Sequence, residues 1–292
     1  MTTPRTLVSA EDASINYVME APSVGLYEAR YVRRQPEYFI IYLSAQSGCD
    51  QACRMCHLTA TGQNRYVDAS FNELMAQAQA VYNHYDRQPP AAWVHYNFMA
   101  RGEALNSTTI RQEGVPLLHA LGALARSRGL ASKYLISTIL PQSLGETELV
   151  ALFDDPQVYP EFYYSLYSVN PDFRRRWLPR ALPAEEGLAR LARWQQATGK
   201  VPKIHFAFIE GENDAERDMH AMADAIENHG LRVDLNIVRY NPYSDKQGRE
   251  SSLAVIERNV GILTDRLHPE NVRIVPKVGF DVKASCGMFV SG

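Results

Sequence analysis

The sequence predicts an α/β protein whose strands and helices form an open, partial (β/α)6 barrel. Short apolar runs rich in β-branched and aromatic residues recur from residue 38 to residue 276, and segments with helical periodicity separate them. Such alternation is typical of a parallel sheet that is buried on both faces and wound with right-handed crossovers. Six strand–helix units are too few for a closed eight-stranded barrel, so we expect an open one.

Each element has its own signal in the sequence. The expected strands are Tyr38–Leu43, Trp93–Phe98, Tyr134–Thr138, Phe162–Leu166, Ile204–Ile209 and Val233–Val238, with Val272–Pro276 as a weaker seventh. The expected helices are Ser70–Tyr85, Val115–Arg128, Gly145–Phe153, Ala184–Thr198, Ala215–Asn228 and Ser252–Leu267. Asp214 and Ser251 stand at expected N-caps, and Gly129, Gly199 and Gly230 stand where helices should end.

The bulk composition is that of an ordinary globular protein. The chain has 292 residues, of which 46% are hydrophobic and 22% charged. A net charge of −3 argues against binding to nucleic acid by bulk electrostatics. We find neither a signal peptide nor an apolar run of the roughly 18 residues that a membrane helix needs. We therefore expect a cytoplasmic protein without a membrane partner, in which cysteine thiolates bind metal rather than pair.

Three of the four cysteines stand close together directly after the first expected strand. Cys49, Cys53 and Cys56 have the spacing C-x3-C-x2-C. Three such thiolates can hold three irons of a [4Fe–4S] cluster and leave the fourth iron open to a small molecule. A zinc site would need His57 or Cys286 as its fourth ligand. Disulfides would strain the short loops and leave one thiol unpaired. The alternative without a function is a chance group of buried cysteines.

Small or polar residues also follow the other expected strands. They are Gly102 and Glu103 after the second strand, Ser137 after the third, Ser165 and Tyr167 after the fourth, and Asn241 after the sixth. A glycine allows close backbone approach, and a neighbouring carboxylate can bind an amine. Hydroxyl groups at strand ends can bind a ligand, although most only satisfy nearby backbone. Because active sites of α/β barrels lie at the C-terminal strand ends, we expect the site at this mouth.

The order of these motifs resembles the radical S-adenosylmethionine (SAM) enzymes and, among them, the RlmN/Cfr family of RNA adenine C-methyltransferases. The matching segments are, in chain order, Glu28–Val32, Ser44–Cys49, Gly62–Arg65, Gly102–Asn106, Ser165–Tyr167, Asn241–Tyr243 and Asp281–Gly287. The resemblance implies a TIM-like radical SAM core barrel over residues 35–270. Residues 1–34 would be an N-terminal extension, a remnant of an accessory segment, and residues 271–292 a C-terminal segment that carries Cys286.

The resemblance also implies a role for each matched residue. Cys49, Cys53 and Cys56 would hold a [4Fe–4S] cluster whose open iron binds SAM. The SAM contacts would be Gly102, Glu103, Ser137, Ser165, Leu166, Tyr167 and Asn241. Cys286 would carry a methyl group received from one SAM and activated by a radical from another, and Glu28 would be a catalytic base. The implied partners are RNA or another nucleobase-containing substrate, and an external electron donor such as flavodoxin or ferredoxin.

Two departures from the family keep alternatives open. Tyr42 stands where the family has a second catalytic cysteine, and a phenol cannot form a disulfide with Cys286. Tyr42 is therefore either only a strand residue or a hydrogen or proton donor. The family's RNA-binding accessory domain and basic C-terminal tail are largely missing, which we expect to lower the affinity for RNA phosphates. The segment Phe173–Arg180 interleaves arginines with aromatic residues and is either a phosphate- and base-binding face or a solvated helix start.

The leading hypothesis is thus a radical SAM methyltransferase that acts on an adenine carbon of RNA or a related nucleobase. The alternative is a radical SAM enzyme of the same fold that acts on a small molecule, nucleoside or peptide without a resolving cysteine. A binding protein that only keeps the fold is a third class, which the intact cysteine triplet disfavours.

Overall fold

A single curved sheet of ten strands organises the chain, and the strands follow one another in sequence order from β1 to β10. The computed structural model describes residues 4–291. Strands β4 to β10 are parallel, whereas β1 to β4 pair as antiparallel neighbours. Within residues 4–291 the order ends at β10, which pairs with β9, so the barrel stays open. The open, partial barrel expected from the sequence is confirmed.

The seven parallel strands form the wall of the barrel. They are β4 (Tyr38–Leu43), β5 (Trp93–Phe98), β6 (Ala131–Thr138), β7 (Glu161–Tyr164), β8 (Lys203–Phe206), β9 (Asp234–Val238) and β10 (Val272–Val275). All seven runs identified in the sequence are strands, including the weaker seventh. Their carboxyl ends lie at one mouth of the barrel, where the loops that carry the expected site residues begin.

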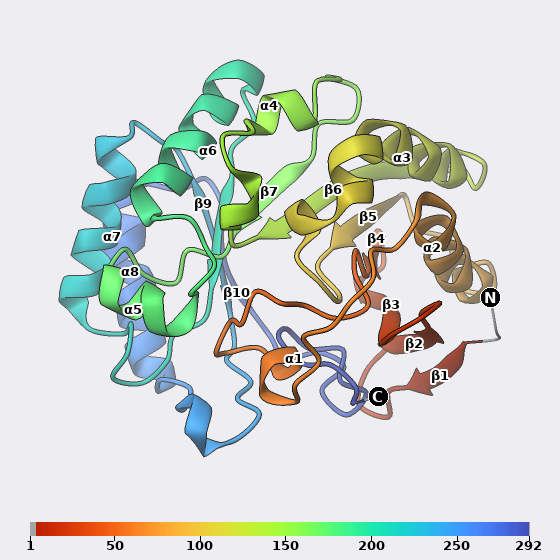
Figure 1. Ribbon diagram of the computed structural model, residues 1–292, viewed down its shortest axis with the longest axis horizontal. Helices are drawn as coiled ribbons and strands as arrows, with labels where there is room; N and C mark the ends of the chain where they lie inside the picture. Colours follow the sequence, from red (N-terminus) through yellow and green to blue (C-terminus); the bar gives the residue numbers. More distant parts are fainter. Residues whose placement is uncertain (1–3, 292) are drawn as a thin grey trace.

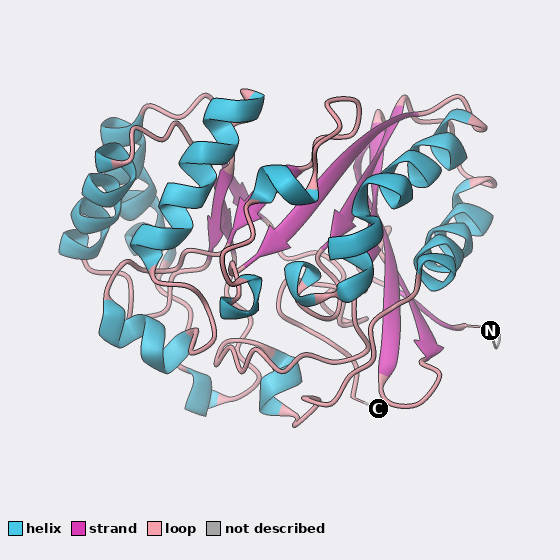
Figure 2. Cartoon of the chain, turned by 45° about the horizontal axis from the view of Figure 1, so that its top comes forward, coloured by secondary structure: helices cyan, strands magenta, loops and turns pink. Residues whose placement is uncertain are grey.

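Helices cover the outer face of the sheet (Figure 1), and the strands lie inside them (Figure 2). The long helices are α2 (Phe71–Tyr85), α3 (Thr108–Arg126), α6 (Ala184–Thr198), α7 (Glu216–Asn228) and α8 (Leu253–Leu267). The short ones are α1 (His57–Ala60), α4 (Leu149–Leu152) and α5 (Pro171–Trp177), with 3-10 turns at Ala104–Asn106, Gln142–Leu144 and Asp245–Gln247. Within residues 4–291 no helix is both long and apolar enough to span a membrane.

Helix ends follow local chemistry and correct three details of the sequence prediction. The expected helix Gly145–Phe153 is reduced to the single turn α4, because Gly145 has a φ of 54°. Ser252, one residue after the expected Ser251, caps α8 through its hydroxyl. Ala215 is the N-cap of α7, and the Asp214 carboxylate instead accepts hydrogen bonds from the Gly211 amide (2.9 Å) and the Ser251 hydroxyl (2.7 Å).

Three antiparallel strands that the sequence did not reveal extend the sheet beyond β4. They are β1 (Arg5–Val8), β2 (Ile15–Glu20) and β3 (Leu26–Gln35). We call residues 279–291 the C-terminal loop. This loop lies against the hairpin formed by β1, β2 and β3, where the Ser9 hydroxyl donates a hydrogen bond to Asp281 Oδ1 at 2.7 Å. It contains Cys286 and lies between the hairpin and the mouth of the barrel.

Candidate active site

The three cysteines of the C-x3-C-x2-C motif line one small cavity at the mouth of the barrel. Its volume is about 120 Å³, and its wall also includes Gly102, Glu103, Ser137 and Ser165. We call it the cysteine cavity. The structure thus brings together the expected cluster ligands and four of the seven expected SAM contacts. They come from the loops after β4, β5 and β7 and from the end of β6, which meet at this mouth.

Close backbone packing holds the cysteine loop in place. A Cβ atom at Gly48 would lie 2.3 Å from the Arg65 carbonyl oxygen, so only glycine fits beside the backbone of Arg65. Gly102 has a φ of 90°, and a Cβ there would meet Gln46 Cβ at 2.5 Å. Gly102 therefore lets the loop after β5 lie directly on the cysteine loop. Ala52, between the first two cysteines, has a left-handed φ of 55°, a conformation that non-glycine residues rarely adopt.

The electrostatics of the cysteine cavity suit a cationic or metal-containing group. Burial raises the pKa of Cys49, Cys53 and Cys56, and for Cys49 and Cys53 the charge of the neighbouring thiolates raises it further. Bound iron reverses this effect because it binds the thiolate form. Within residues 4–291 no three His, Cys, Asp or Glu side chains could hold one metal ion. Cysteines that bind different irons of a cubane need not converge on one point, so the cavity fits the expected cluster.

Glu103 is a buried carboxylate with a strongly shifted pKa. Burial raises the pKa to about 7, although the carboxylate accepts hydrogen bonds from the Leu105 and Ile139 amides, each at 3.1 Å. A cationic amine in the cysteine cavity would favour the ionised form and lower this pKa again. Glu103 is therefore suited to bind an ammonium group.

The remaining expected SAM contacts have other surroundings. The side chains of Leu166 and Tyr167 are buried, and neither residue lines the cysteine cavity. The Asn241 amide donates to the Ser285 hydroxyl at 3.1 Å and to the Cys286 carbonyl at 3.0 Å. Asn241 thus holds the C-terminal loop, and its contact with SAM stays a prediction, as do those of Leu166 and Tyr167.

Cys286 lies beside a second, larger cavity inside the barrel. This cavity has a volume of about 690 Å³, and we call it the barrel cavity. The Cys286 sulfur is 3.9 Å from Nε2 of His205, and burial raises the pKa of its thiol to about 11. Met99 lines both the barrel cavity and the cysteine cavity, so the two cavities are adjacent. Tyr42, on β4, also lines the barrel cavity and is therefore on the same cavity as Cys286.

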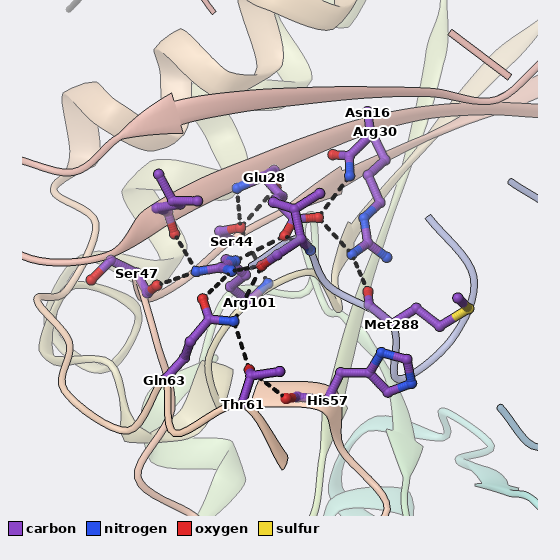
Figure 3. Close-up of polar contacts among 12 residues, drawn as sticks. Asn16, Glu28, Arg30, Ser44, Ser47, His57, Thr61, Gln63, Arg101 and Met288 are labelled. Atoms are coloured by element: carbon purple, nitrogen blue, oxygen red, sulfur yellow. Dashed lines mark hydrogen bonds and ion pairs between the residues drawn. The ribbon is translucent and has the colours of Figure 1, made fainter. Parts of the chain in front are cut away.

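Glu28 on β3 lies at the centre of a buried polar network (Figure 3). Its Oε1 accepts hydrogen bonds from Arg101 Nε (2.9 Å) and the Val290 amide (3.1 Å). Its Oε2 accepts from Arg30 Nη2 (2.9 Å) and Asn16 Nδ2 (2.8 Å). Burial alone would raise the pKa of Glu28, but the two guanidinium groups and these hydrogen bonds outweigh it and lower the pKa. A saturated carboxylate with a lowered pKa is a weak base.

The same network holds the C-terminal loop on both sides of Cys286. Arg30 donates to the Ala284 carbonyl (3.1 Å) and the Met288 carbonyl (2.7 Å), and Arg101 donates to the Val290 carbonyl (2.7 Å). The His57 amide adds a hydrogen bond to the Gly287 carbonyl at 3.0 Å. Sequence reasoning missed Asn16 and Arg101 as candidate functional residues, whereas Arg30 stood out as a basic residue beside Glu28. The position of Arg101 directly before Gly102-Glu103 was the one signal that could have drawn attention to it.

The arginines of Phe173–Arg180 are mostly used within the protein. Arg174 is buried and donates to the Leu166 carbonyl at 2.8 Å and the Leu182 carbonyl at 2.6 Å. Arg176 pairs with Glu212 at 2.9 Å, and Arg180 pairs with Asp50 at 2.5 Å. Asp50 lies inside the cysteine motif, so Arg180 connects α5 and the loop that follows it to the candidate site.

Comparisons with known proteins identify relatives of this chain and a solved structure of the same fold. No family model matches the chain. The chain is 26% identical over 252 residues to the "Probable dual-specificity RNA methyltransferase RlmN" of Synechococcus sp. (strain RCC307), covering 85% of this chain and 68% of that one. It is 23% identical over 297 residues to the protein of the same name from Enterococcus faecalis (strain ATCC 700802 / V583), covering 97% and 76%.

A solved structure shows the same fold. The crystal structure of a radical SAM methyltransferase from Sphaerobacter thermophilus matches 98% of this chain and 81% of its own, with a TM-score of 0.78 and 24% identity. The fold, the cysteine motif at the mouth of the barrel and the repeated similarity to RlmN proteins point in one direction. This chain resembles the radical SAM enzymes and, among them, the RlmN-like group.

Proposed function

We propose that this enzyme transfers a methyl group through Cys286 to a ring carbon of a nucleobase, by similarity to its relatives an adenine carbon of RNA. The position of Cys286 carries this proposal: its half-buried side chain lines the barrel cavity, next to the cavity lined by the three other cysteines. The similarity to proteins named as probable RNA methyltransferases supports the reaction class.

The cysteine cavity would hold the cofactors. Cys49, Cys53 and Cys56 would bind a [4Fe–4S] cluster, and Glu103 would bind the ammonium group of SAM. Gly102, Ser137 and Ser165 line the same cavity and would contact the rest of SAM. When bound, the cluster and SAM supply a methyl group and an organic radical, with the electron coming from a donor such as flavodoxin or ferredoxin.

Cys286 would act in two stages. Its sulfur first exchanges the thiol proton for a methyl group, so that an S–CH3 bond replaces the S–H bond. The methyl group would then lose a hydrogen atom to the radical that the bound cofactors supply, and its carbon would bond to the base carbon. Release would break the bond between sulfur and the transferred carbon, and the ring hydrogen would pass to that carbon as a proton, so that a methyl group forms on the base. The sulfur radical left on Cys286 would take up one electron, from a second thiol or from the external donor. The Glu28 and Arg30 network would hold the C-terminal loop so that the sulfur faces the barrel cavity throughout.

The presence of Tyr42 suggests a second candidate function. The chain has four cysteines, three of which would bind the cluster, so no further thiol is left to form a disulfide with Cys286. Tyr42 lines the same cavity as Cys286 but cannot take over that step. This observation favours a radical SAM reaction on a small molecule, nucleoside or peptide whose release does not need a second thiol.

Anaerobic turnover with methyl-labelled SAM tests the proposal. The reconstituted protein is incubated with reductant and with RNA, free nucleosides or nucleotides, and labelled products are identified by mass spectrometry. We expect label on a nucleobase carbon in the wild type. Cys286→Ser should cleave SAM to 5′-deoxyadenosine but label no base. Methyl transfer to a base by Cys286→Ser would contradict the proposal, and label found only on non-nucleoside compounds would support the second candidate.

A further inference from the structure

The interior of this barrel is hollow and polar. Closed (β/α)8 barrels fill their interior with layers of Val, Ile and Leu side chains, and protein interiors contain few voids larger than a water molecule. Here the barrel cavity has a volume of about 690 Å³, and the side chains that line it include His95 and Asn97 of β5, Lys133 of β6, Lys203 and His205 of β8, and Asn236 of β9. A large polar hollow in the place of a packed core indicates that a polar ligand completes the interior.

The end of the barrel cavity near Cys286 carries groups that recognise hydrogen-bonding edges. Asn97 is only 4% exposed, and its Oδ1 has no hydrogen-bond partner within residues 4–291. Burial lowers the pKa of His205 to about 4, so its imidazole is neutral, and its Nδ1 lies 2.7 Å from the Asn236 amide. A neutral imidazole and two amides offer both donors and acceptors, as the edge of a heterocyclic base requires.

The opposite end of the barrel cavity is cationic. Burial and the charges of Lys133, Lys203 and Arg273, opposed by Glu161, lower the pKa of His95 to about 4. Glu161 neutralises only one of these cations, since it pairs with Lys203 at 3.0 Å. The remaining positive charges are those of Lys133, which lies 4.2 Å from the Trp93 ring, and Arg273. His95 Nε2 is buried there without a partner among residues 4–291.

The barrel cavity carries an excess of positive charge, although the protein as a whole has a negative net charge. Eight Lys or Arg residues and three Asp or Glu residues line the barrel cavity, whereas the chain as a whole has a net charge of −3. Four of the eight cations are in ion pairs, namely Arg30, Lys203, Arg239 and Lys277. Within residues 4–291 this leaves Arg34, Lys133, Lys200 and Arg273 against Asp234 and Glu270. Lys133 and Arg273, which form no ion pair with any residue from 4 to 291, match a phosphate monoester, which carries about two negative charges at neutral pH. Lys200 and Glu270, which precede β8 and β10, also line the cavity, so it extends to the end of the barrel opposite the cysteines.

We propose that the barrel cavity binds a free nucleoside monophosphate, with its base beneath Cys286 against Asn97 and its phosphate between Lys133 and Arg273. The proposal rests on the proposed function, because it takes Cys286 as the methyl carrier above the base. The volume lies within the range of about 300–1,000 Å³ that is usual for small-molecule pockets. Outside the mouth, Arg176 and Arg180 form ion pairs with Glu212 and Asp50, and these carboxylates offset part of the attraction that the two arginines would have for the phosphates of an RNA chain.

Equilibrium binding to the reconstituted holoprotein, without reductant so that no turnover occurs, tests this inference. The probes are AMP, GMP, CMP and UMP, the matching nucleosides, and an RNA hairpin with an unpaired adenine. We expect at least one monophosphate to bind saturably, its nucleoside to bind about tenfold more weakly, and the hairpin not to compete. Lys133→Met should remove the preference for the monophosphate while nucleoside affinity stays unchanged. Lys246→Met, at an exposed lysine outside the cavity, is the matched control and should keep the preference.

Three results would overturn the inference: no monophosphate binds, monophosphate and nucleoside bind equally to the wild type, or the hairpin displaces the bound monophosphate. The methylation state of Cys286 is determined on the same preparation after anaerobic incubation with SAM and reductant. A methylated Cys286 without monophosphate binding contradicts only the ligand assigned here. Monophosphate binding without a methyl group on Cys286 contradicts the proposed function and leaves the binding site standing.

Discussion

Arg101 and Glu28 form an ion pair in which Nε lies 2.9 Å from Oε1 and neither side chain has exposed surface. Burying such a pair costs free energy unless the remaining donors and acceptors are also satisfied. The other guanidinium nitrogens of Arg101 donate to the Ser47 carbonyl (2.7 Å), the Gln63 amide oxygen (2.6 Å) and the Val290 carbonyl (2.7 Å). The pair therefore joins the cysteine loop to the C-terminal loop, and so relates the proposed cluster ligands to the proposed methyl carrier.

Glu28→Gln should destabilise the fold and release the C-terminal loop. The amide of glutamine carries no negative charge, and its NH2 group would face guanidinium groups that are themselves hydrogen-bond donors. Breaking a buried ion pair in this way costs about 3–5 kcal/mol. We expect a loss of this order in the free energy of unfolding in urea and faster hydrogen exchange over residues 279–291. Glu11→Gln, at an exposed position, is the control and should change neither quantity.

The same variant separates two roles for Glu28. If Glu28 positions the C-terminal loop, Glu28→Gln should lower methylation of Cys286 while SAM is still cleaved to 5′-deoxyadenosine. If Glu28 is instead a base that acts on the substrate, Cys286 should be methylated normally and only the final product should be lost. Quantifying both species by mass spectrometry decides between the two.

The contribution of Glu28 to stability should depend on pH in one direction. The pKa of its carboxyl is lowered from an ordinary value of 4.5, so the folded state binds the proton less tightly than the unfolded chain. The stabilisation is therefore complete above about pH 4.5 and is lost as the pH falls through the lowered pKa. The difference in unfolding free energy between wild type and Glu28→Gln, measured on the metal-free protein, should shrink below pH 4.5. A difference that stays constant down to pH 3 would count against the ion pair.

SAM binding should weaken below neutral pH because of Glu103. Its pKa is raised to about 7, so the carboxyl gains its proton as the pH falls through 7 and can no longer attract an ammonium group. We expect the affinity for SAM to fall by up to about tenfold per pH unit below 7. Glu103→Gln should bind SAM weakly at every pH with a flat profile. An unchanged pH dependence in this variant would mean that another group is responsible.

Tyr42→Cys should add a route for release of the methylated base, because it supplies a second thiol that can form a disulfide with Cys286. Tyr42 lines the barrel cavity together with Cys286, so a thiol at position 42 would face the same space. If the lack of a second thiol limits the reaction, methylated adenine should rise in Tyr42→Cys and remain low in Tyr42→Phe. Loss of adenine methylation in both variants would instead identify the phenol of Tyr42 as a hydrogen or proton donor.

The sequence predicted those elements that local pattern alone determines. The bounds of β4, β5 and α6 match because continuous apolar runs or a regular helical face define them. β3 escaped prediction because Glu28 and Arg30 interrupt its apolar pattern, and these charges can be buried only because Asn16, Arg101 and the C-terminal loop satisfy them.

Some features of the candidate site could likewise be predicted from local sequence, and others could not. Spacing identified the cysteine motif, whose members are near neighbours in the chain, and the cavity formed by strand ends follows from the alternation of strands and helices. The network around Arg101 could not be foreseen, because its partners come from four segments that are distant in sequence and meet only in the fold. The polar interior was equally hidden, since each inward-facing histidine or lysine is unremarkable within its own strand.

Mass spectrometry of the peptide that contains Cys286 tests the central claim most directly. The reconstituted protein is incubated anaerobically with reductant and methyl-labelled SAM, and cleavage of SAM to 5′-deoxyadenosine is measured in the same sample. The account predicts a labelled methyl group on Cys286 and none on Cys49, Cys53 or Cys56. Formation of 5′-deoxyadenosine with Cys286 left unmodified would contradict it.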